Sequence, residues 1–166
     1  RNSVENCIQS DTHEVIVVLG HQSAEIRNEL NPLEVCFVEN PSFESGMLSS
    51  IQAAIPKVSS KSAGWMVFLG DQPKIPQNLV NHLIEQFQKH HEAEKDLIVL
   101  PVCAGIRRNP VIFSRSFNQR MIAHQGEGGK AMIDAHQDSL LEVEVDDVTL
   151  FEDIDTEEDY DLLKPN

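Results

Sequence analysis

The residue with the clearest chemical potential in this 166-residue chain is Asp71, which follows the apolar run Val67–Leu69 and Gly70 and precedes Gln72 and Pro73. An apolar strand that stops at a carboxylate places that carboxylate at the carboxyl edge of a parallel sheet, where open α/β folds bind ligands. Asp71 is therefore a candidate metal ligand. The alternative is that these residues only form a turn, because glycine, aspartate and proline are common in strand-to-helix connections.

The strands that would position Asp71 are predicted from continuous apolar runs rich in β-branched residues. Four such runs lie at 15–19, 35–38, 65–69 and 97–100. Runs of this kind are typical of parallel strands that are covered on both faces. The fourth strand is predicted to end at Pro101, since proline cannot donate a ladder hydrogen bond.

Helices are predicted between these strands. The first begins with Ser23 as its N-cap and ends before Pro32, and the second covers 47–55. The third has one apolar stripe at positions i, i+3, i+4 and i+7, formed by Val80, Leu83, Ile84 and Phe87. The alternation of strands and helices predicts an α/β fold in three layers, with a doubly wound, mostly parallel sheet and right-handed crossovers.

The last third of the chain is less regular. It carries a predicted strand at 110–113, helices at 115–124 and 129–136, and a strand at 140–145 in which apolar and acidic residues alternate. A terminal helix is predicted from Thr156, which with Asp159 forms a variant of the capping box. No repeat or linker interrupts the chain, so a single domain over 1–166 is expected.

The charge of the chain restricts its partners. The formal net charge is −14, from 27 acidic and 13 basic residues. Nucleic acids and anionic membranes both require a basic patch, so neither is an expected partner. A small phosphate ligand remains compatible with an acidic protein, provided that a divalent cation and backbone amides hold the phosphates.

The cysteines and the apolar runs indicate a cytoplasmic protein. Cys7, Cys36 and Cys103 are odd in number and show no Cys-x-x-Cys spacing, which predicts free thiols in a reducing compartment. No run approaches the ~20 apolar residues of a membrane span. No signal-peptide pattern opens the sequence.

Four short segments together have a specific family pattern: Gly46-Met-Leu-Ser-Ser-Ile51, Leu69-Gly-Asp-Gln-Pro73, Arg108-Asn-Pro-Val-Ile-Phe113 and Asp153-Ile-Asp-Thr-Glu-Glu-Asp159. Here the chain resembles the MobA-like nucleotidyltransferases, which include the molybdenum cofactor cytidylyl- and guanylyltransferases. That family has a glycine-serine segment after a strand, a Leu-Gly-Asp-Gln-Pro-like metal loop, an Asn-Pro-Val-Leu-Phe-like strand and a closing Asp-Ile-Asp-Thr-Pro-Glu-Asp-like segment. Each match alone is weak, but all four occur in order along most of the chain.

The resemblance implies a reaction. A nucleoside monophosphate would pass from CTP or GTP to a phosphorylated acceptor, in the first place molybdopterin, with release of pyrophosphate. Such an in-line displacement depends mainly on alignment and charge neutralisation. Mg²⁺ is the implied metal, because it binds through one or two carboxylates plus phosphate oxygens. A molybdoenzyme or its chaperone is the implied protein partner, and the implied fold is the Rossmann-like one of nucleotide-diphospho-sugar transferases.

The resemblance also implies roles for single residues. Asp71 matches the family's metal aspartate and is the implied catalytic residue, and Asp155 is the implied second metal or substrate contact. A structural reason competes for Asp155 and Asp153, since carboxylates near a helix start favour the positive end of its dipole. The implied nucleotide or substrate contacts are Ser49, Ser50, Gly70, Gln72, Asn109 and Lys130.

Structural alternatives exist for several of these contacts too. Small polar residues such as Ser49 and Ser50, in the first turns of a helix, commonly satisfy only backbone donors. The pair Asn109-Pro110 is ordinary turn chemistry. Lys130 lies in a loose version of a glycine-rich family segment and offers a point charge without the bidentate fork of arginine.

The departures from the family are also informative. Nothing in residues 1–13 matches its glycine-rich loop with Arg and Lys, so the chain is expected to lack the first βα unit. That loop would wrap the triphosphate with backbone amides and cations. Without it, the chain is expected to bind nucleotide poorly and to be inactive as it stands. The alternative function is therefore a degenerate or truncated, non-catalytic accessory module for cofactor delivery. Arg108, where the family often has glycine, leaves the acceptor open.

Other site classes fit less well. Asp153-Ile-Asp155 has the paired carboxylates of an aspartyl-phosphate phosphatase, but in that class the nucleophile ends the first strand. Gly20-His-Gln-Ser23 lacks the Gly-x-Gly-x-x-Gly turn of dinucleotide-binding domains. The histidines show no His-x-x-x-His or Cys-His spacing, which argues against a transition-metal site.

Overall fold

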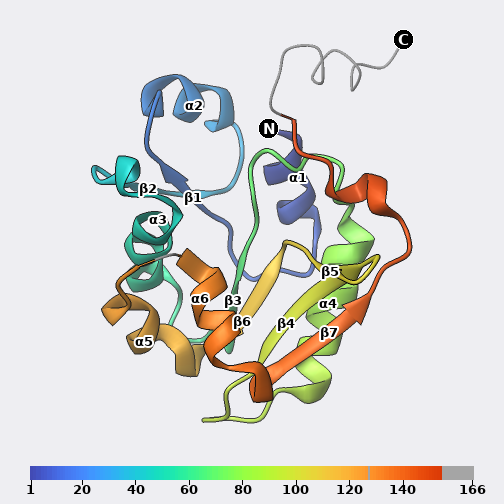
Figure 1. The fold of residues 1–166 in the computed structure, drawn as a ribbon. Helices are drawn as coiled ribbons and strands as arrows, with labels where there is room; N and C mark the ends of the chain where they lie inside the picture. Colours follow the sequence, from blue (N-terminus) through green and yellow to red (C-terminus); the bar gives the residue numbers. More distant parts are fainter. Residues whose placement is uncertain (127, 155–166) are drawn as a thin grey trace.

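Strands and helices alternate along the chain, as the apolar runs predict (Figure 1). The structure, a computed structural model, describes residues 1–126 and 128–154. The strands are β1 (Ile16–Leu19), β2 (Cys36–Glu39), β3 (Gly64–Val67), β4 (Ile98–Cys103), β5 (Ile106–Arg107), β6 (Val111–Ser114) and β7 (Leu140–Glu144). The α-helices are α1 (Asn2–Gln9), α2 (Ser23–Leu30), α3 (Met47–Ala54), α4 (Gln77–His90), α5 (Asn118–Ala123) and α6 (Gly128–Ala135). The predicted terminal helix from Thr156 lies outside the described residues.

The strands form a mixed arrangement. β1 and β2 pair in parallel, and a second sheet has the order β3-β6-β4-β5, with β7 parallel to β4. β6 is antiparallel to both β3 and β4. The short connection through β5 explains this, because a parallel return needs a crossover of a dozen or more residues. The α/β class is confirmed, and β6 makes the sheet mixed.

The side chains of β4 alternate between two hydrophobic clusters. Ile98, Leu100 and Val102 pack with apolar residues of α3, α5 and α6, whereas Val99 and Cys103 pack with those of α4. A strand that is buried on both faces produces this period of two. Helices therefore cover both faces of the sheet, and the predicted three-layer arrangement is confirmed (Figure 1).

Two local predictions were wrong. Pro101 does not end the fourth strand but lies inside β4, opposite Val143 of β7. The Pro101 carbonyl oxygen accepts a hydrogen bond from the Arg108 N–H at 2.8 Å. The missing N–H of Pro101 faces the same side, where β4 changes its partner from β6 to β5, so no hydrogen bond between the strands is lost. Ser23 is the first residue of α2, and the N-cap is Gln22 in a left-handed conformation (φ 52°).

The two sheets do not pair with each other within the described residues. Between them lies a cavity of about 740 Å³, lined by residues 15–18 on the β1 side and 64–70 on the β3 side, with α1, α3 and α4 contributing the remaining walls. The expected lack of a first βα unit stays a prediction.

Candidate functional site

Asp71 lies just beyond the carboxyl end of β3 and is exposed. Val67, the last residue of β3, pairs with Val111, so the Asn109–Pro110 segment that precedes β6 lies at the same edge of the sheet. Within the described residues, the Asp71 carboxylate has no hydrogen bond and no ion pair with lysine or arginine. The carboxylate is therefore available to a ligand, as the sequence predicts for a metal-binding aspartate.

Helix α1 holds the loop that carries Asp71. The Ser3 hydroxyl donates to the carbonyl oxygen of Gly70 at 2.9 Å, and the Asn6 side-chain amide donates to that of Ile75 at 2.8 Å. Ser3 and Ile75 are both buried. The loop from Gly70 to Ile75 is thus anchored at both ends against an element for which the sequence analysis assigned no role.

A segment some eighty residues further along the chain holds the other side of this loop. The Gln72 amide nitrogen Nε2 donates to Asp153 Oδ1 at 2.8 Å, and the Ile154 N–H donates to the carbonyl oxygen of Asp71 at 2.9 Å. The Lys74 ammonium forms an ion pair with Glu152 at 2.5 Å. Asp155 itself lies outside the described residues. The residue before it, Ile154, is nevertheless bonded directly to the backbone of Asp71.

Ser49 and Ser50 lie in the first turn of α3, beside the end of β2. Asn40, which is buried, donates its side-chain N–H groups to Ser49 Oγ at 2.8 Å and Ser50 Oγ at 3.0 Å. The Ser49 hydroxyl lies within hydrogen-bonding distance of the carbonyl oxygens of Ser42 and Gly46. The one donor of Ser49 is therefore used locally, whereas the Ser50 hydroxyl donates to no described group.

Asn40 was missed by the sequence analysis. It follows β2 and precedes Pro41, so it occupies the same kind of position after a strand as Asp71 does after β3. A lone polar residue at the end of an apolar strand was the available signal. Its burial and its two serine partners depend on the packing of α3 on β1 and β2, which no local pattern contains.

The remaining predicted contacts lie in different surroundings. Asn109 is half-buried, and Gly70 is exposed with no atom within 4 Å of the position that a Cβ would take. Lys130 is exposed on α6, which packs against α3 and not against the Asp71 loop. Arg108 places its guanidinium 5.9 Å from the centre of the Phe151 ring, and its Nε is buried without a partner among the described residues.

The donor set at this edge fits a hard divalent cation. Mg²⁺ keeps most of its water and phosphate ligands and needs only one or two protein carboxylates. Asp71 supplies one exposed carboxylate that no described cation neutralises. No group of three or more His, Cys, Asp or Glu side chains in residues 1–126 and 128–154 could enclose a metal. An ion at Asp71 would therefore take its remaining ligands from water and from a bound phosphate.

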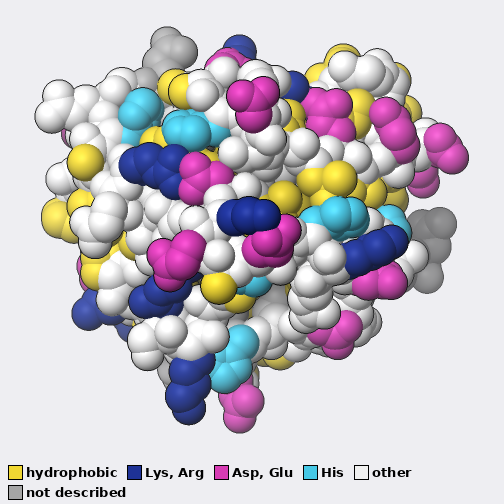
Figure 2. Space-filling model, turned by 90° about the horizontal axis from the view of Figure 1, so that it is seen from below, with side chains coloured by type: hydrophobic (Ala, Val, Ile, Leu, Met, Phe, Trp, Pro, Cys, Tyr) yellow, Lys and Arg dark blue, Asp and Glu magenta, His cyan; other side chains and the backbone are white. Residues whose placement is uncertain are grey.

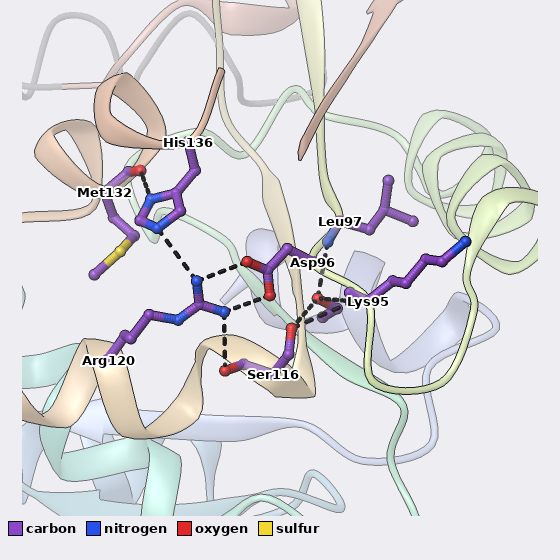
Figure 3. A network of polar contacts seen from close by, with 8 residues as sticks. Lys95, Asp96, Leu97, Ser116, Arg120, Met132 and His136 are labelled. Carbon is purple, nitrogen blue, oxygen red and sulfur yellow. Dashed lines mark hydrogen bonds and ion pairs between the residues drawn. The ribbon is translucent and has the colours of Figure 1, made fainter. Parts of the chain in front are cut away.

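A second polar network lies at the opposite edge of the sheet, before β4 (Figure 3). Arg120 donates to both carboxylate oxygens of Asp96, to the Ser116 carbonyl oxygen at 3.2 Å and to His136 Nε2 at 3.2 Å. His136 donates from Nδ1 to the carbonyl oxygen of Met132 at 2.8 Å. The Arg120 guanidinium also stacks on the Phe117 ring. This network joins α5, α6 and β4 and has no contact with the Asp71 loop.

The surface charge is mixed where it can be seen. On the face shown in Figure 2, the basic and acidic side chains are interspersed, without a continuous patch of either sign. Several charged side chains of the described residues form ion pairs, for example Arg27 with Glu39 and Arg107 with Glu142. None of the helices in the described part of the chain is long and apolar enough to cross a membrane.

Known proteins share this arrangement. The family model described as "MobA-like NTP transferase domain" matches residues 1–146. The molybdenum cofactor cytidylyltransferase of Escherichia coli (strain K12) is 25% identical over 167 residues, which cover 98% of this chain and 79% of that protein. The crystal structure of Rv0371c from Mycobacterium tuberculosis H37Rv superposes with a TM-score of 0.80 at 20% identity, over 98% of this chain and 80% of the other.

The structure of the Rv0371C complex with manganese superposes with a TM-score of 0.77 at 22% identity, over 98% of this chain and 83% of the other. At this level of identity, the two structural matches establish the shared fold. The family model goes further, because it covers most of the sequence and includes the Asp71 loop. The chain therefore belongs to the family of MobA-like NTP transferase domains, which are nucleotidyltransferases.

Proposed function

We propose that the protein transfers a nucleoside monophosphate from CTP or GTP to a phosphorylated, pterin-type acceptor and releases pyrophosphate. The observation that carries this proposal is the exposed Asp71 carboxylate at the carboxyl end of β3, held in a loop anchored from two sides and paired with no described cation. The family membership supports the reaction class. The acceptor is taken from the similarity to the molybdenum cofactor cytidylyltransferase.

We propose Mg²⁺ as the metal, supported by the oxygen donor at Asp71 and by the manganese complex of the related Rv0371C fold. When bound, such an ion would neutralise charge on the phosphates during the in-line displacement. The protein's own contribution is alignment: Asp71 would hold the ion, and α1 with the segment 152–154 keeps the loop in place. Asp155 is proposed as the second metal or substrate contact.

The polar groups around this edge would contact the nucleotide or the acceptor. Ser50 and Asn109 are proposed for this role. Ser50 lies in α3 after β2, Asn109 precedes β6 at the sheet edge where β3 ends, and neither side chain donates to another described group. Lys130 would reach a phosphate only as a point charge from α6. The free thiols of Cys7, Cys36 and Cys103 support the proposal of a cytoplasmic location, where a molybdoenzyme or its chaperone would receive the product.

The competing function is a non-catalytic accessory module of the same family. Both functions require a nucleotide or cofactor at the same edge of the sheet. They differ in whether pyrophosphate is released.

Isothermal titration of the complete protein with CTP, GTP and ATP, with and without Mg²⁺, tests the proposal. We expect heat with CTP or GTP that depends on Mg²⁺ and is lost in Asp71→Asn, with an unchanged circular dichroism spectrum. The control Asp146→Asn removes another exposed carboxylate and should bind as the wild type does. Heat without pyrophosphate release in the presence of molybdopterin would favour the accessory function. No heat with any nucleotide would contradict both.

A further inference from the structure

Gln72 stands beside Asp71 in sequence, and the family resemblance implies that it contacts the nucleotide. The structure places its side chain in the interior instead: the residue is 6% exposed, and its Nε2 is bonded to Asp153 Oδ1 at 2.8 Å. The other amide atom, Oε1, is buried with no partner in residues 1–126 and 128–154. An amide in this position does not face a ligand that arrives at the exposed carboxylate next to it.

We infer that Gln72 is a positioning residue, which holds Asp71 in register with the segment 152–154. This inference rests on the proposed function, because it concerns the metal contact of that site. The geometry has two parts. The Gln72 side chain is hydrogen-bonded to Asp153, and the Asp71 backbone carbonyl is hydrogen-bonded to the next residue, Ile154. Two bonds at adjacent positions restrict both the distance and the rotation between the loop and the segment.

The burial of Gln72 gives its bond with Asp153 more weight than the neighbouring ion pair has. Lys74 and Glu152 join the same two segments, but their side chains are 33% and 54% exposed, and exposed pairs contribute little. A hydrogen bond from a buried amide to a carboxylate is stronger than one between neutral groups. When the Gln72 bond is lost, the loop keeps its α1 anchors at Gly70 and Ile75 and the backbone bond between Ile154 and Asp71, but it loses the second bond to the segment 152–154 that restricts rotation.

The consequence is a defined effect on metal affinity. An ion held by Asp71 and by further oxygen ligands needs them at set separations, because Mg²⁺ demands near-ideal octahedral geometry and Mn²⁺ also favours six oxygen ligands. Without the Gln72 bond, Asp71 would remain exposed but would sample several positions relative to residues 153–154. Metal binding would then weaken although no metal ligand has been changed.

The test measures Mn²⁺ binding to the 166-residue chain from the loss of the electron paramagnetic resonance signal of free Mn²⁺. We expect Gln72→Met, which keeps the length and burial of the side chain, to raise the dissociation constant at least fivefold. The matched control is Gln52→Met. Gln52 also donates its amide to carbonyl oxygens, those of Met121, Ile122 and His124, but it joins α3 to α5 away from the loop. That variant should lose stability and keep its Mn²⁺ affinity within twofold.

Exchanging the amide and the carboxylate between positions 72 and 153 separates a positioning role of Gln72 from a general effect on folding. Gln72→Glu places a second carboxylate against Asp153 and should weaken Mn²⁺ binding as well, whereas the double variant Gln72→Glu/Asp153→Asn restores a donor opposite an acceptor. We expect the double variant to bind Mn²⁺ within threefold of the wild type. If Gln72→Met does not fold, this rescue carries the test alone, and failure of the rescue in a folded double variant contradicts the inference.

The outcomes distinguish this inference from the proposed function. Wild-type affinity in Gln72→Met, together with loss of binding in Asp71→Asn, would overturn the positioning role and leave the metal site intact. Equal Mn²⁺ binding by the wild type and by Asp71→Asn would overturn the metal site itself. Equal losses in Gln72→Met and Gln52→Met would show that the effect is only one of stability.

Discussion

Gly70, Asp71 and Gln72 were all predicted to contact a ligand, but these neighbouring residues differ in burial. Asp71 and Gly70 are exposed, whereas Gln72 is buried. The reason is that the loop lies between α1 and the segment 152–154, so each successive side chain faces a different neighbour. Motif position therefore predicted the exposed carboxylate, whereas the burial of the residue beside it depends on contacts with residues far away in the sequence.

Asp96 is the acidic residue whose environment changes its titration most clearly. The hydrogen bonds from Arg120 lower the pKa of the Asp96 carboxyl below its ordinary value of 3.8. A carboxyl with a lowered pKa in the folded state stabilises the fold fully above the pKa of the unfolded state. That stabilisation is lost as the pH falls through the lowered pKa.

We therefore expect Asp96→Asn to reduce the free energy of unfolding by about 1 kcal/mol at pH 7, a value that takes into account the partial exposure of both partners. The difference from the wild type should shrink as the pH falls below 3.8, because the wild-type carboxyl then becomes protonated as well. Urea unfolding of both proteins across this pH range measures the difference in the free energy of unfolding. Asp138→Asn, at an exposed residue without a described partner, is the control, and a difference that is independent of pH would exclude the ion pair as the cause.

Among the elements, β3 is covered closely at its start. A Cβ added to Gly64 would lie 2.5 Å from the Phe113 carbonyl oxygen of β6 and 2.7 Å from Cζ of Phe87 in α4. Neither the paired strand nor the buried ring can move away easily. The glycine thus allows β6 and α4 to approach the strand that ends at the Asp71 loop.

Gly64→Ala should therefore reduce the free energy of unfolding by about 2 kcal/mol through overpacking. Gly70→Ala, at the other end of the same strand and loop, meets no atom within 4 Å and should change it by less than about 0.5 kcal/mol. Thermal unfolding of the two variants gives the comparison. Equal stability of the two variants would mean that β6 and α4 shift to accommodate the added methyl group without loss of stability.

For the whole molecule, the main feature is the cavity of about 740 Å³ between the two sheets. Its walls are largely apolar, and they include Trp65 and Val67 of β3, Val17 of β1 and Cys7 of α1. Helices α1 and α3 contribute to it from the two sides of the sheet. Burial in this wall raises the pKa of the Cys7 thiol to about 12, which suppresses its reactive thiolate.

Thiol labelling should report whether the cavity between the sheets is closed to solvent. We expect the native chain to react rapidly at the exposed Cys36 with Ellman's reagent at pH 8, and slowly at the buried Cys7 and Cys103. Denaturation should make all three reactive at similar rates. Rapid labelling of Cys7 in the native chain, identified by mass spectrometry, would mean that the cavity between the sheets opens to solvent.

The sequence by itself determined the elements and the place of Asp71. Apolar runs with period two or 3.6 are local properties, so the strands β1 to β4 and the stripe of α4 follow from them. A carboxylate directly after a buried strand then lies at the carboxyl edge, because all parallel strands end there. The four family segments depend on local residue order in the same way.

Only the tertiary structure decided which of these parts meet. The antiparallel place of β6 between β3 and β4, the serine contacts of Asn40 and the bond from Gln72 to Asp153 all join residues whose partners are set by packing. Local patterns contain no information about such pairs, because their free energy is gained only when distant elements close on one another. For that reason the exposed position of Asp71 at the sheet edge was predictable, and the residue inferred to position it was not.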